Sequence, residues 1–161
     1  MEIGVYKGVA TCWFLKNIVK DRSSRLYAID TFEGSPEYNE DFTEVEQIFY
    51  KNVEKTGKSD QVKVYKMFST QALIDIHNEQ TVSFDIIFID ASHESRDVIM
   101  DAVMSWKLLN KNGVLIFDDY LWNKLEPKYF TPKPAIDSFL YIYSPEITIL
   151  YKGYQVIISK K

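Results

Sequence analysis

The sequence has little of several residue types, and each scarcity excludes a class of protein. Cys12 is the only cysteine among 161 residues, so no intrachain disulfide can form and nothing points to an oxidising compartment. No apolar run approaches the ~18 residues of a membrane-spanning helix, and the N-terminus has no signal-peptide pattern. The chain carries 19 basic and 23 acidic side chains without a long basic stripe, which argues against a nucleic-acid partner. We therefore expect a cytoplasmic protein with no nucleic-acid or membrane partner, whose ligands are small molecules or proteins.

The length and the composition predict one globular domain over residues 1–161. Hydrophobic residues make up 46% of the chain and charged residues 26%, which is ordinary for a folded domain. A chain of this length buries roughly 70% of the surface that its unfolded form exposes. Cys12 lies in the apolar run VATCWFL, where a small buried side chain is expected more often than a nucleophile.

Strand-like and helix-like runs alternate along most of the chain. The apolar pattern predicts strands at residues 2–5, 25–30, 62–66, 84–89 and 113–117, and helices at residues 9–21, 42–56, 69–78 and 94–110. This alternation is typical of right-handed βαβ crossovers, which build a parallel sheet with helices on both faces. The sequence thus predicts an α/β protein with a Rossmann-like three-layer sandwich.

The last part of the chain departs from this alternation. A loop with three prolines leads to a predicted helix at residues 135–143, and ITILYKGYQVIISKK then shows two strand-like runs separated by Lys152 and Gly153. Two strands joined by so tight a turn must be antiparallel. The mostly parallel sheet is therefore expected to close with an antiparallel C-terminal hairpin.

Two of the predicted strands run directly into polar residues. FDIIFIDASH leads into Asp90 and His93, and GVLIFDDY leads into Asp118 and Asp119. Ligands of open α/β sheets sit beyond the carboxyl ends of the strands. Since carboxylates are costly to bury without partners, these ends predict a binding site.

The first strand leads into a glycine-containing turn, E-I-G-V-Y-K-G, before the first helix. Gly4 and Gly8 would let the backbone turn sharply and approach a ligand, although turn glycines are also common in ordinary loops. Asp30 ends the second strand, where a carboxylate can accept hydrogen bonds from ribose hydroxyls. Together they favour a cofactor that contains a nucleoside.

The segments E-I-G-V-Y-K-G, LYAIDTFEG, FDIIFIDASHE, GVLIFDDY and GYQVIISKK resemble the class I S-adenosylmethionine-dependent methyltransferases. More narrowly, they are similar to methyltransferase family 24, which is related to the macrocin and catechol O-methyltransferases. The resemblance covers nearly the whole chain and implies a seven-stranded sheet in the order 3-2-1-4-5-7-6. It also implies one methyltransferase domain over residues 1–161 whose first strand is clipped, as in an N-terminally truncated member, because Glu2 already lies inside the motif.

The resemblance implies a set of residues that bind S-adenosylmethionine. The turn after the first strand would pack against the methionine part of the cofactor, Asp30 would hold the ribose, and the residues after the third strand would line the adenine. The implied cofactor-binding residues are Glu2, Gly4, Tyr6, Gly8, Asp30, Phe68, Ser69 and Asp90.

The resemblance also implies a metal site at the acidic strand ends. Asp90, Asp118 and Asp119 match positions that bind a divalent cation in metal-dependent O-methyltransferases, and magnesium prefers such oxygen ligands. A bound Mg²⁺ would lower the pKa of a substrate hydroxyl and align it with the methyl group. The alternative for the Asp118-Asp119 pair is a turn in which one carboxylate caps backbone amides.

His93 has two interpretations of equal weight. It lies where the catechol-type enzymes carry a basic residue, so with Asp90 it is a candidate catalytic residue that takes the hydroxyl proton. Alternatively, it caps the next helix or bonds a neighbouring acid. Four aromatic residues nearby either wall a substrate site or pin the loop to the sheet; they are Tyr120, Trp122, Tyr129 and Phe130.

The expected function is O-methylation of a small-molecule hydroxyl, assisted by magnesium if the metal site forms. One alternative is a protein that keeps the fold without turnover, which the short first strand would explain. Another is a nicotinamide-dependent oxidoreductase, which is disfavoured because the turn lacks the G-x-G-x-x-G pattern. A truncated sheet edge would favour pairing into a homo-oligomer.

Overall fold

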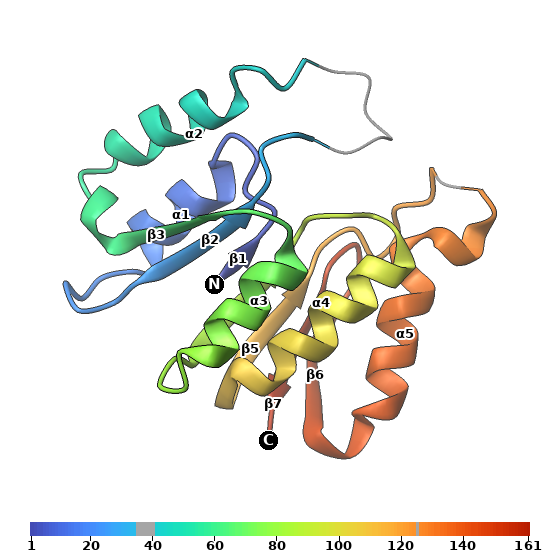
Figure 1. Ribbon diagram of the computed structural model, residues 1–161. Coiled ribbons are helices and arrows are strands. Elements are labelled where there is room, and N and C mark those ends of the chain that lie inside the picture. The colour runs from blue at the N-terminus through green and yellow to red at the C-terminus, as the bar shows by residue number, and fades with distance from the viewer. Residues whose placement is uncertain (35–40, 125) are drawn as a thin grey trace. The chain divides into compact units, whose positions relative to one another are not determined.

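The computed structural model describes residues 1–34, 41–124 and 126–161, without the side chain of Tyr129. Part of the loop predicted after the second strand, residues 35–40, lies outside the described residues, as does Tyr129 as a candidate wall of a substrate site. Within the described residues the strands are β1 (Glu2–Ile3), β2 (Leu26–Asp30), β3 (Val62–Lys66), β4 (Phe84–Ile89), β5 (Leu109–Phe117), β6 (Ile147–Lys152) and β7 (Val156–Lys160). The α-helices are α1 (Val9–Asn17), α2 (Val45–Glu54), α3 (Ser69–Asn78), α4 (Ser95–Leu108) and α5 (Pro132–Ile142) (Figure 1).

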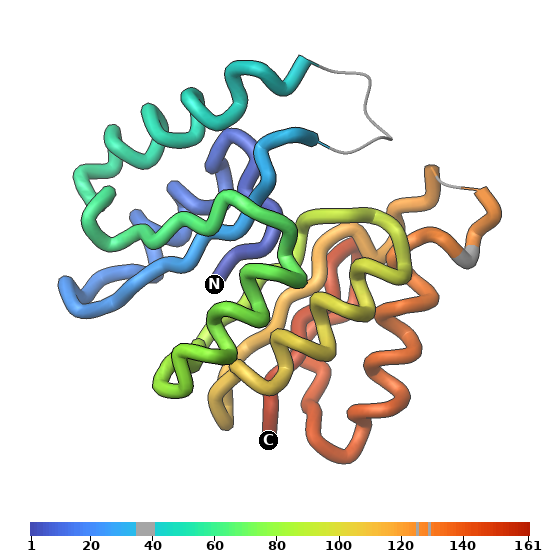
Figure 2. Tube along the Cα trace, viewed as in Figure 1, coloured from blue at the N-terminus to red at the C-terminus, as the bar shows by residue number. Residues whose placement is uncertain are grey.

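The chain forms two compact units, residues 1–68 and residues 69–161, which can be followed by colour in Figure 2. In the first unit β1 and β3 both pair with β2 in parallel. Its core is a cluster of apolar side chains from β2, α1, α2 and the adjoining loops: Val5, Leu15, Val19, Leu26, Ala28, Phe32, Val45, Phe49 and Val53. Helices α1 and α2 therefore share one apolar core with β2.

In the second unit β4 pairs with β5 in parallel, and β7 pairs with both β5 and β6 in antiparallel orientation. Helix α4 packs against α3, α5, β4 and β5. Phe117, Ile136 and Phe139 are among the fully buried side chains of this unit. Apolar residues of β5 and α5 thus meet in its core.

The strand order is β3-β2-β1-β4-β5-β7-β6, as the family resemblance implied. The predicted antiparallel hairpin is confirmed as β6 and β7. The predicted fold class is therefore confirmed, with a mostly parallel sheet flanked by helices.

Several predicted boundaries differ from the observed ones for local reasons. Strand β1 has two residues because Gly4 adopts φ +84°, which ends the extended backbone. Strand β5 is assigned from Leu109, since Leu109 pairs with Phe84 before residues 110–113 bulge out and pairing resumes at Val114. Helix α5 begins three residues early, at Pro132, because proline is well suited to the first turn of a helix.

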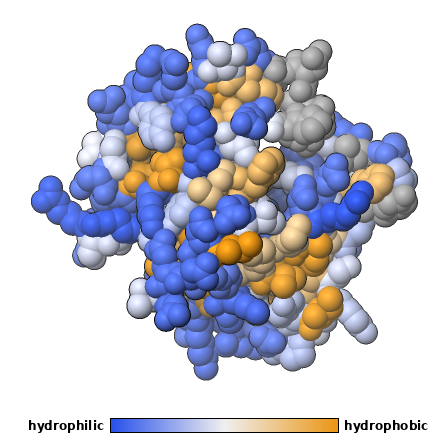
Figure 3. All heavy atoms as spheres, viewed as in Figure 1, coloured by the Kyte–Doolittle hydropathy of each residue, from blue (hydrophilic) through white to orange (hydrophobic). Residues whose placement is uncertain are grey.

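Some large apolar side chains remain exposed. On the face that Figure 3 shows, hydrophilic side chains predominate, with separate apolar areas between them. Exposed apolar residues on α5 and β6 are Tyr141, Ile142, Ile149, Leu150 and Tyr151. Pairing into a homo-oligomer stays a prediction.

No helix within the described residues is long and apolar enough to span a membrane.

We predict that Gly8→Ala lowers the free energy of unfolding more than Gly57→Ala does. Both glycines have positive φ, +79° and +71°, which costs an alanine about 1 kcal/mol. A Cβ at Gly8 would lie 2.9 Å from Cδ2 of Phe49, whereas at Gly57 no described atom lies within 4 Å. Overpacking against the buried Phe49 ring adds about 1–3 kcal/mol at Gly8 alone. Urea unfolding of both variants measures the difference, and equal losses would contradict the prediction.

Candidate functional site

The turn after β1 has an unusual backbone. Gly4, Tyr6 and Gly8 adopt φ values of +84°, +48° and +79°, all in the left-handed region. The Gly4 amide donates to the Ile29 carbonyl at 2.9 Å, and the Gly8 amide donates to the Val5 carbonyl at 2.7 Å. Left-handed backbone at alternate residues folds the chain tightly between β1 and α1.

Asp30 at the end of β2 holds this turn in place. Its Oδ2 accepts hydrogen bonds from the amides of Val5 and Tyr6, each at 2.8 Å. Its Oδ1 accepts the amide of Phe32 at 2.7 Å. The structure thus brings together the acid and the glycine turn that the sequence singled out.

Glu2 belongs to β1, the strand that leads into the turn. It is 1% exposed, and its Oε2 accepts a hydrogen bond from the Thr11 hydroxyl at 2.7 Å. Thr11 lies on α1 and is fully buried. This buried pair ties β1 to α1 on the core side of the turn.

Tyr6 and Phe68, two predicted cofactor contacts, present their rings differently. Tyr6 is half-exposed, and its ring meets Phe42 in an edge-to-face contact at 6.2 Å. Phe68 follows β3 and is 71% exposed. An aromatic ring this exposed offers a face on which a planar ligand could stack.

Ser69, the other residue expected near the adenine, is the first residue of α3. Its hydroxyl hydrogen-bonds to Asp101, a buried carboxyl on α4. Sequence analysis missed Asp101, because one acid among apolar helix positions gives no sign of what it will contact. Ser69 is thus fixed from within its own unit.

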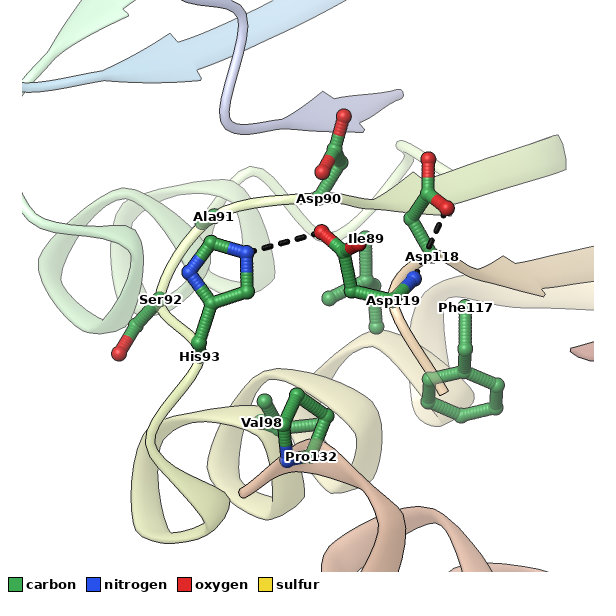
Figure 4. A pocket seen from close by; sticks show the side chains of 10 residues that line it. All are labelled: Ile89, Asp90, Ala91, Ser92, His93, Val98, Phe117, Asp118, Asp119 and Pro132. Carbon is green, nitrogen blue, oxygen red and sulfur yellow. Dashed lines mark hydrogen bonds and ion pairs between the residues drawn. The ribbon is translucent and has the colours of Figure 1, made fainter. Parts of the chain in front are cut away.

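The acidic strand ends of the second unit line a pocket together with Pro132 and nearby apolar residues (Figure 4). Burial, followed by the negative charges of Asp118 and Asp119, raises the pKa of Asp90 to about 7, while His93 opposes the rise. The Asp90 carboxylate points away from the bond between His93 and Asp119. Asp90 can therefore exchange a proton near neutral pH.

His93 is paired with Asp119. The His93 Nε2 lies 2.8 Å from Asp119 Oδ2, and the ring stacks on Trp122 with centroids 4.2 Å apart. Burial raises the pKa of Asp119, but hydrogen bonds from His93 and Tyr154 outweigh it and leave that pKa below its usual range. Of the two interpretations of His93, the bond to a neighbouring acid is observed, and its role as a base stays a prediction.

The Ser92 side chain makes two hydrogen bonds at the start of helix α4. The Ser92 hydroxyl accepts the amide of Glu94 at 3.1 Å and donates to Asp97 at 2.7 Å. The helix-cap interpretation of His93 stays a prediction.

The three carboxylates predicted to bind a metal do not converge. Asp118 Oδ1 accepts the amide of Asp119, and its Oδ2 accepts the Gln155 side chain at 3.1 Å. The Asp119 carboxylate turns to His93 instead, because Asp119 adopts φ +55°. Among residues 1–34, 41–124 and 126–161 no three acidic, histidine or cysteine side chains are grouped to hold a metal ion. The turn interpretation of the pair thus describes the structure better than the metal site.

The aromatic residues of the loop after β5 are held by other side chains. Tyr120 is buried, and its hydroxyl donates to Asp137 at 2.9 Å and accepts from Lys133 at 2.7 Å. Trp122 is buried against His93, and the Phe130 ring lies 5.3 Å from the Arg96 guanidinium. For these three rings the contacts match a loop pinned to its own unit.

Sequence analysis also missed Tyr154 and Gln155. Both lie in the turn of the β6-β7 hairpin and reach back to Asp119 and Asp118. The hairpin was predicted, but nothing in its pattern indicated which polar residue would face the acids.

The chain is similar in sequence to known methyltransferases. The family model described as "Methyltransferase domain", methyltransferase family 24, matches residues 1–120. The chain is 29% identical over 122 residues to the "Probable caffeoyl-CoA O-methyltransferase 3" of Dictyostelium discoideum. It is also 29% identical over 119 residues to an O-methyltransferase of Aspergillus hancockii. These matches cover 76% and 74% of this chain but 43% and 41% of the relatives, so the chain spans about two fifths of their length.

Solved structures share its fold. The O-methyltransferase from Bacillus cereus, in complex with SAH, has a TM-score of 0.74 at 21% identity, covering 99% of this chain and 72% of that chain. The O-methyltransferase TomG from Streptomyces achromogenes, involved in tomaymycin synthesis and in complex with SAM, has a TM-score of 0.75 at 14% identity, covering 99% and 71%. At these identities the likeness shows the fold alone.

We predict that magnesium does not bind at the acidic strand ends, because Asp118 and Asp119 are turned to different partners. Calorimetric titration with magnesium chloride should give no saturable heat, and Asp118→Asn should give the same trace. Asp85→Asn, which alters an acid bonded to Asn110, is the control. A saturable isotherm that Asp118→Asn abolishes and Asp85→Asn preserves would restore the metal site.

Proposed function

Because the chain belongs to methyltransferase family 24, we propose that it transfers the methyl group of S-adenosylmethionine to a hydroxyl oxygen of a small molecule. The observation that carries the proposal is the left-handed turn after β1, held by the Asp30 carboxylate. Such a turn lets the backbone come close to a cofactor. We further propose that residues 1–161 act as one methyltransferase domain.

The cofactor is proposed to lie against the turn with its ribose at Asp30. A carboxylate has about four hydrogen-bond acceptor positions. Amides of the described residues use two positions on Oδ2 and one on Oδ1. One position on Oδ1 is left, so Asp30 would accept a single ribose hydroxyl.

We propose the remaining cofactor contacts at the turn after β1 and at the residues that follow β3. Glu2 supports the turn from the core side, and Tyr6 and Gly8 complete its backbone. The exposed ring of Phe68 would stack on the adenine, and Ser69 would make a polar contact to it. The relatives in complex with SAH and SAM support this choice of cofactor.

The transfer would be a direct displacement. A lone pair of the acceptor oxygen forms the new bond to the methyl carbon, while the electrons of the sulfur–carbon bond stay on sulfur and leave S-adenosylhomocysteine. The acceptor hydroxyl must also lose its proton. Alignment of oxygen, methyl group and sulfur supplies most of the rate enhancement in such a reaction.

Two residues are proposed to receive the proton. Asp90 has a pKa near 7, which suits a group that exchanges protons at neutral pH. His93 is bonded to Asp119, whose carboxylate would stabilise the ring once it is protonated. No step is assigned to magnesium, since Asp118 and Asp119 diverge.

Calorimetry distinguishes this function from its alternatives. We expect saturable heat with S-adenosylmethionine and with S-adenosylhomocysteine, and none with NADH. Heat with NADH alone would favour an oxidoreductase and overturn the proposal. Binding of S-adenosylmethionine without methyl transfer to any member of a panel of phenols and sugars would favour a non-enzymatic protein.

We predict that His93→Ala lowers kcat about 10²-fold if the ring takes the proton, because general-base catalysis contributes at least that much. The affinity for S-adenosylhomocysteine should stay unchanged. His77→Ala is the matched control, since His77 lies on α3 and bonds the Met104 carbonyl. A kcat equal to that of the wild type would assign the proton to Asp90 instead.

A further inference from the structure

The turn between β6 and β7 reaches back to the loop that follows β5, within the second unit. Tyr154 and Gln155 belong to that turn. The Tyr154 carbonyl accepts the Tyr120 amide at 2.9 Å, and the Gln155 side chain donates to Asp118 Oδ2 at 3.1 Å. The Tyr154 side chain makes a third contact, a hydrogen bond with the Asp119 carboxylate. Backbone and side chains of the turn thus both hold the loop that carries the two acids.

Of these three contacts, the Tyr154 side chain makes the one that reaches the acid bonded to His93. Asp119 Oδ2 lies 2.8 Å from His93 Nε2 (Figure 4). Burial raises the pKa of Asp119, but the hydrogen bonds outweigh it and keep this carboxyl ionised at neutral pH. An ionised carboxylate can only accept hydrogen bonds. The Tyr154 hydroxyl and the His93 Nε2–H group are therefore both donors to Asp119.

The second donor restricts a side chain that has rotational freedom. The last torsion of an aspartate side chain is broad, so a carboxylate that meets a single donor can still rotate. The imidazole of His93 is held separately, because it stacks on Trp122 with centroids 4.2 Å apart. The hydrogen bond from Tyr154 does for the carboxylate what this stacking does for the ring. Both halves of the pair between Asp119 and His93 are thus held from outside it.

We propose that Tyr154 is a positioning residue, whose hydroxyl holds the Asp119 carboxylate in the orientation that accepts the Nε2 proton of His93. The inference rests on the proposed function, because this orientation matters for methyl transfer only if His93 receives the proton of the acceptor hydroxyl. While Nε2 keeps its own proton on Asp119, any proton that the neutral ring takes must enter at Nδ1. The position of Asp119 therefore decides which ring nitrogen acts as the base.

The test follows the ring N–H protons of the histidines by NMR, without any cofactor. The chain has two histidines, and His77 serves as the internal reference because it lies on α3 and its Nε2 is 3.0 Å from the Met104 carbonyl oxygen. In Tyr154→Phe the His93 ring proton should exchange with water at least about fivefold faster, the worth of roughly one hydrogen bond. The ring proton of His77 should keep its wild-type rate.

Two matched variants separate positioning from a general loosening of the turn. Gln155→Ala removes the side-chain bond that the same turn makes to the other acid. Tyr151→Phe removes the hydroxyl of a β6 tyrosine that is 54% exposed, against 51% for Tyr154. Both variants should keep the wild-type exchange rate of the His93 proton. In Asp119→Ala this proton should exchange fast, and adding Tyr154→Phe should not accelerate it further, because the hydroxyl acts only through the carboxylate.

Faster exchange in Tyr154→Phe, with wild-type rates in Gln155→Ala and Tyr151→Phe, supports the inference. An unchanged rate in Tyr154→Phe, or an equal acceleration in either matched variant, overturns it. A wild type whose His93 ring proton exchanges too fast to detect also overturns it, since the carboxylate would then not hold that proton. The proposed function fails by a different observation, the absence of heat with S-adenosylhomocysteine, because the NMR measurement needs no cofactor.

Discussion

The hydrogen bonds between the Asp30 carboxylate and the amides of Val5 and Tyr6 hold the N-terminal end of the first unit together. A strand as short as β1 makes few ladder bonds, so it cannot by itself fix the turn that follows. The carboxylate supplies further hydrogen bonds to the backbone, because it accepts two amides of the left-handed turn. The rest of the unit adapts to that turn, with Gly8 against the Phe49 ring and the Asn52 side chain on the Lys7 carbonyl.

In the second unit three carboxylates lie near one another, so their negative charges must be compensated. Asp118 accepts hydrogen bonds from an amide and from Gln155, and Asp119 is stabilised by His93 and Tyr154. These hydrogen bonds compensate the negative charges of those two acids. Burial raises the pKa of Asp90 to about 7, and the negative charges of Asp118 and Asp119 add to the rise. Proton exchange by Asp90 near neutral pH thus follows from its burial beside two charged acids.

The sequence predicted the parts of the fold that depend on periodicity. The runs VKVYK and FDIIFI became β3 and β4 with the expected bounds, and the hairpin followed from the tight turn at Gly153. The sequence could not predict the features that depend on backbone conformation or on which residue a side chain contacts. Asp118 and Asp119 are neighbours in the chain, yet the positive φ of Asp119 sends their carboxylates to different partners. Asp101 gave no periodic signal, because a single polar residue on an apolar helix face does not reveal its contact.

A carboxylate that braces the fold can also bind a ligand, provided that it keeps an acceptor position. Asp30 uses three of about four positions on described amides, so binding one ribose hydroxyl would complete its hydrogen bonding without breaking a structural bond. The structural bonds of Asp30 fix which acceptor position is left, and that position decides what the carboxylate can recognise. Residues of this kind are preorganised for a ligand because the folded chain has already restricted them.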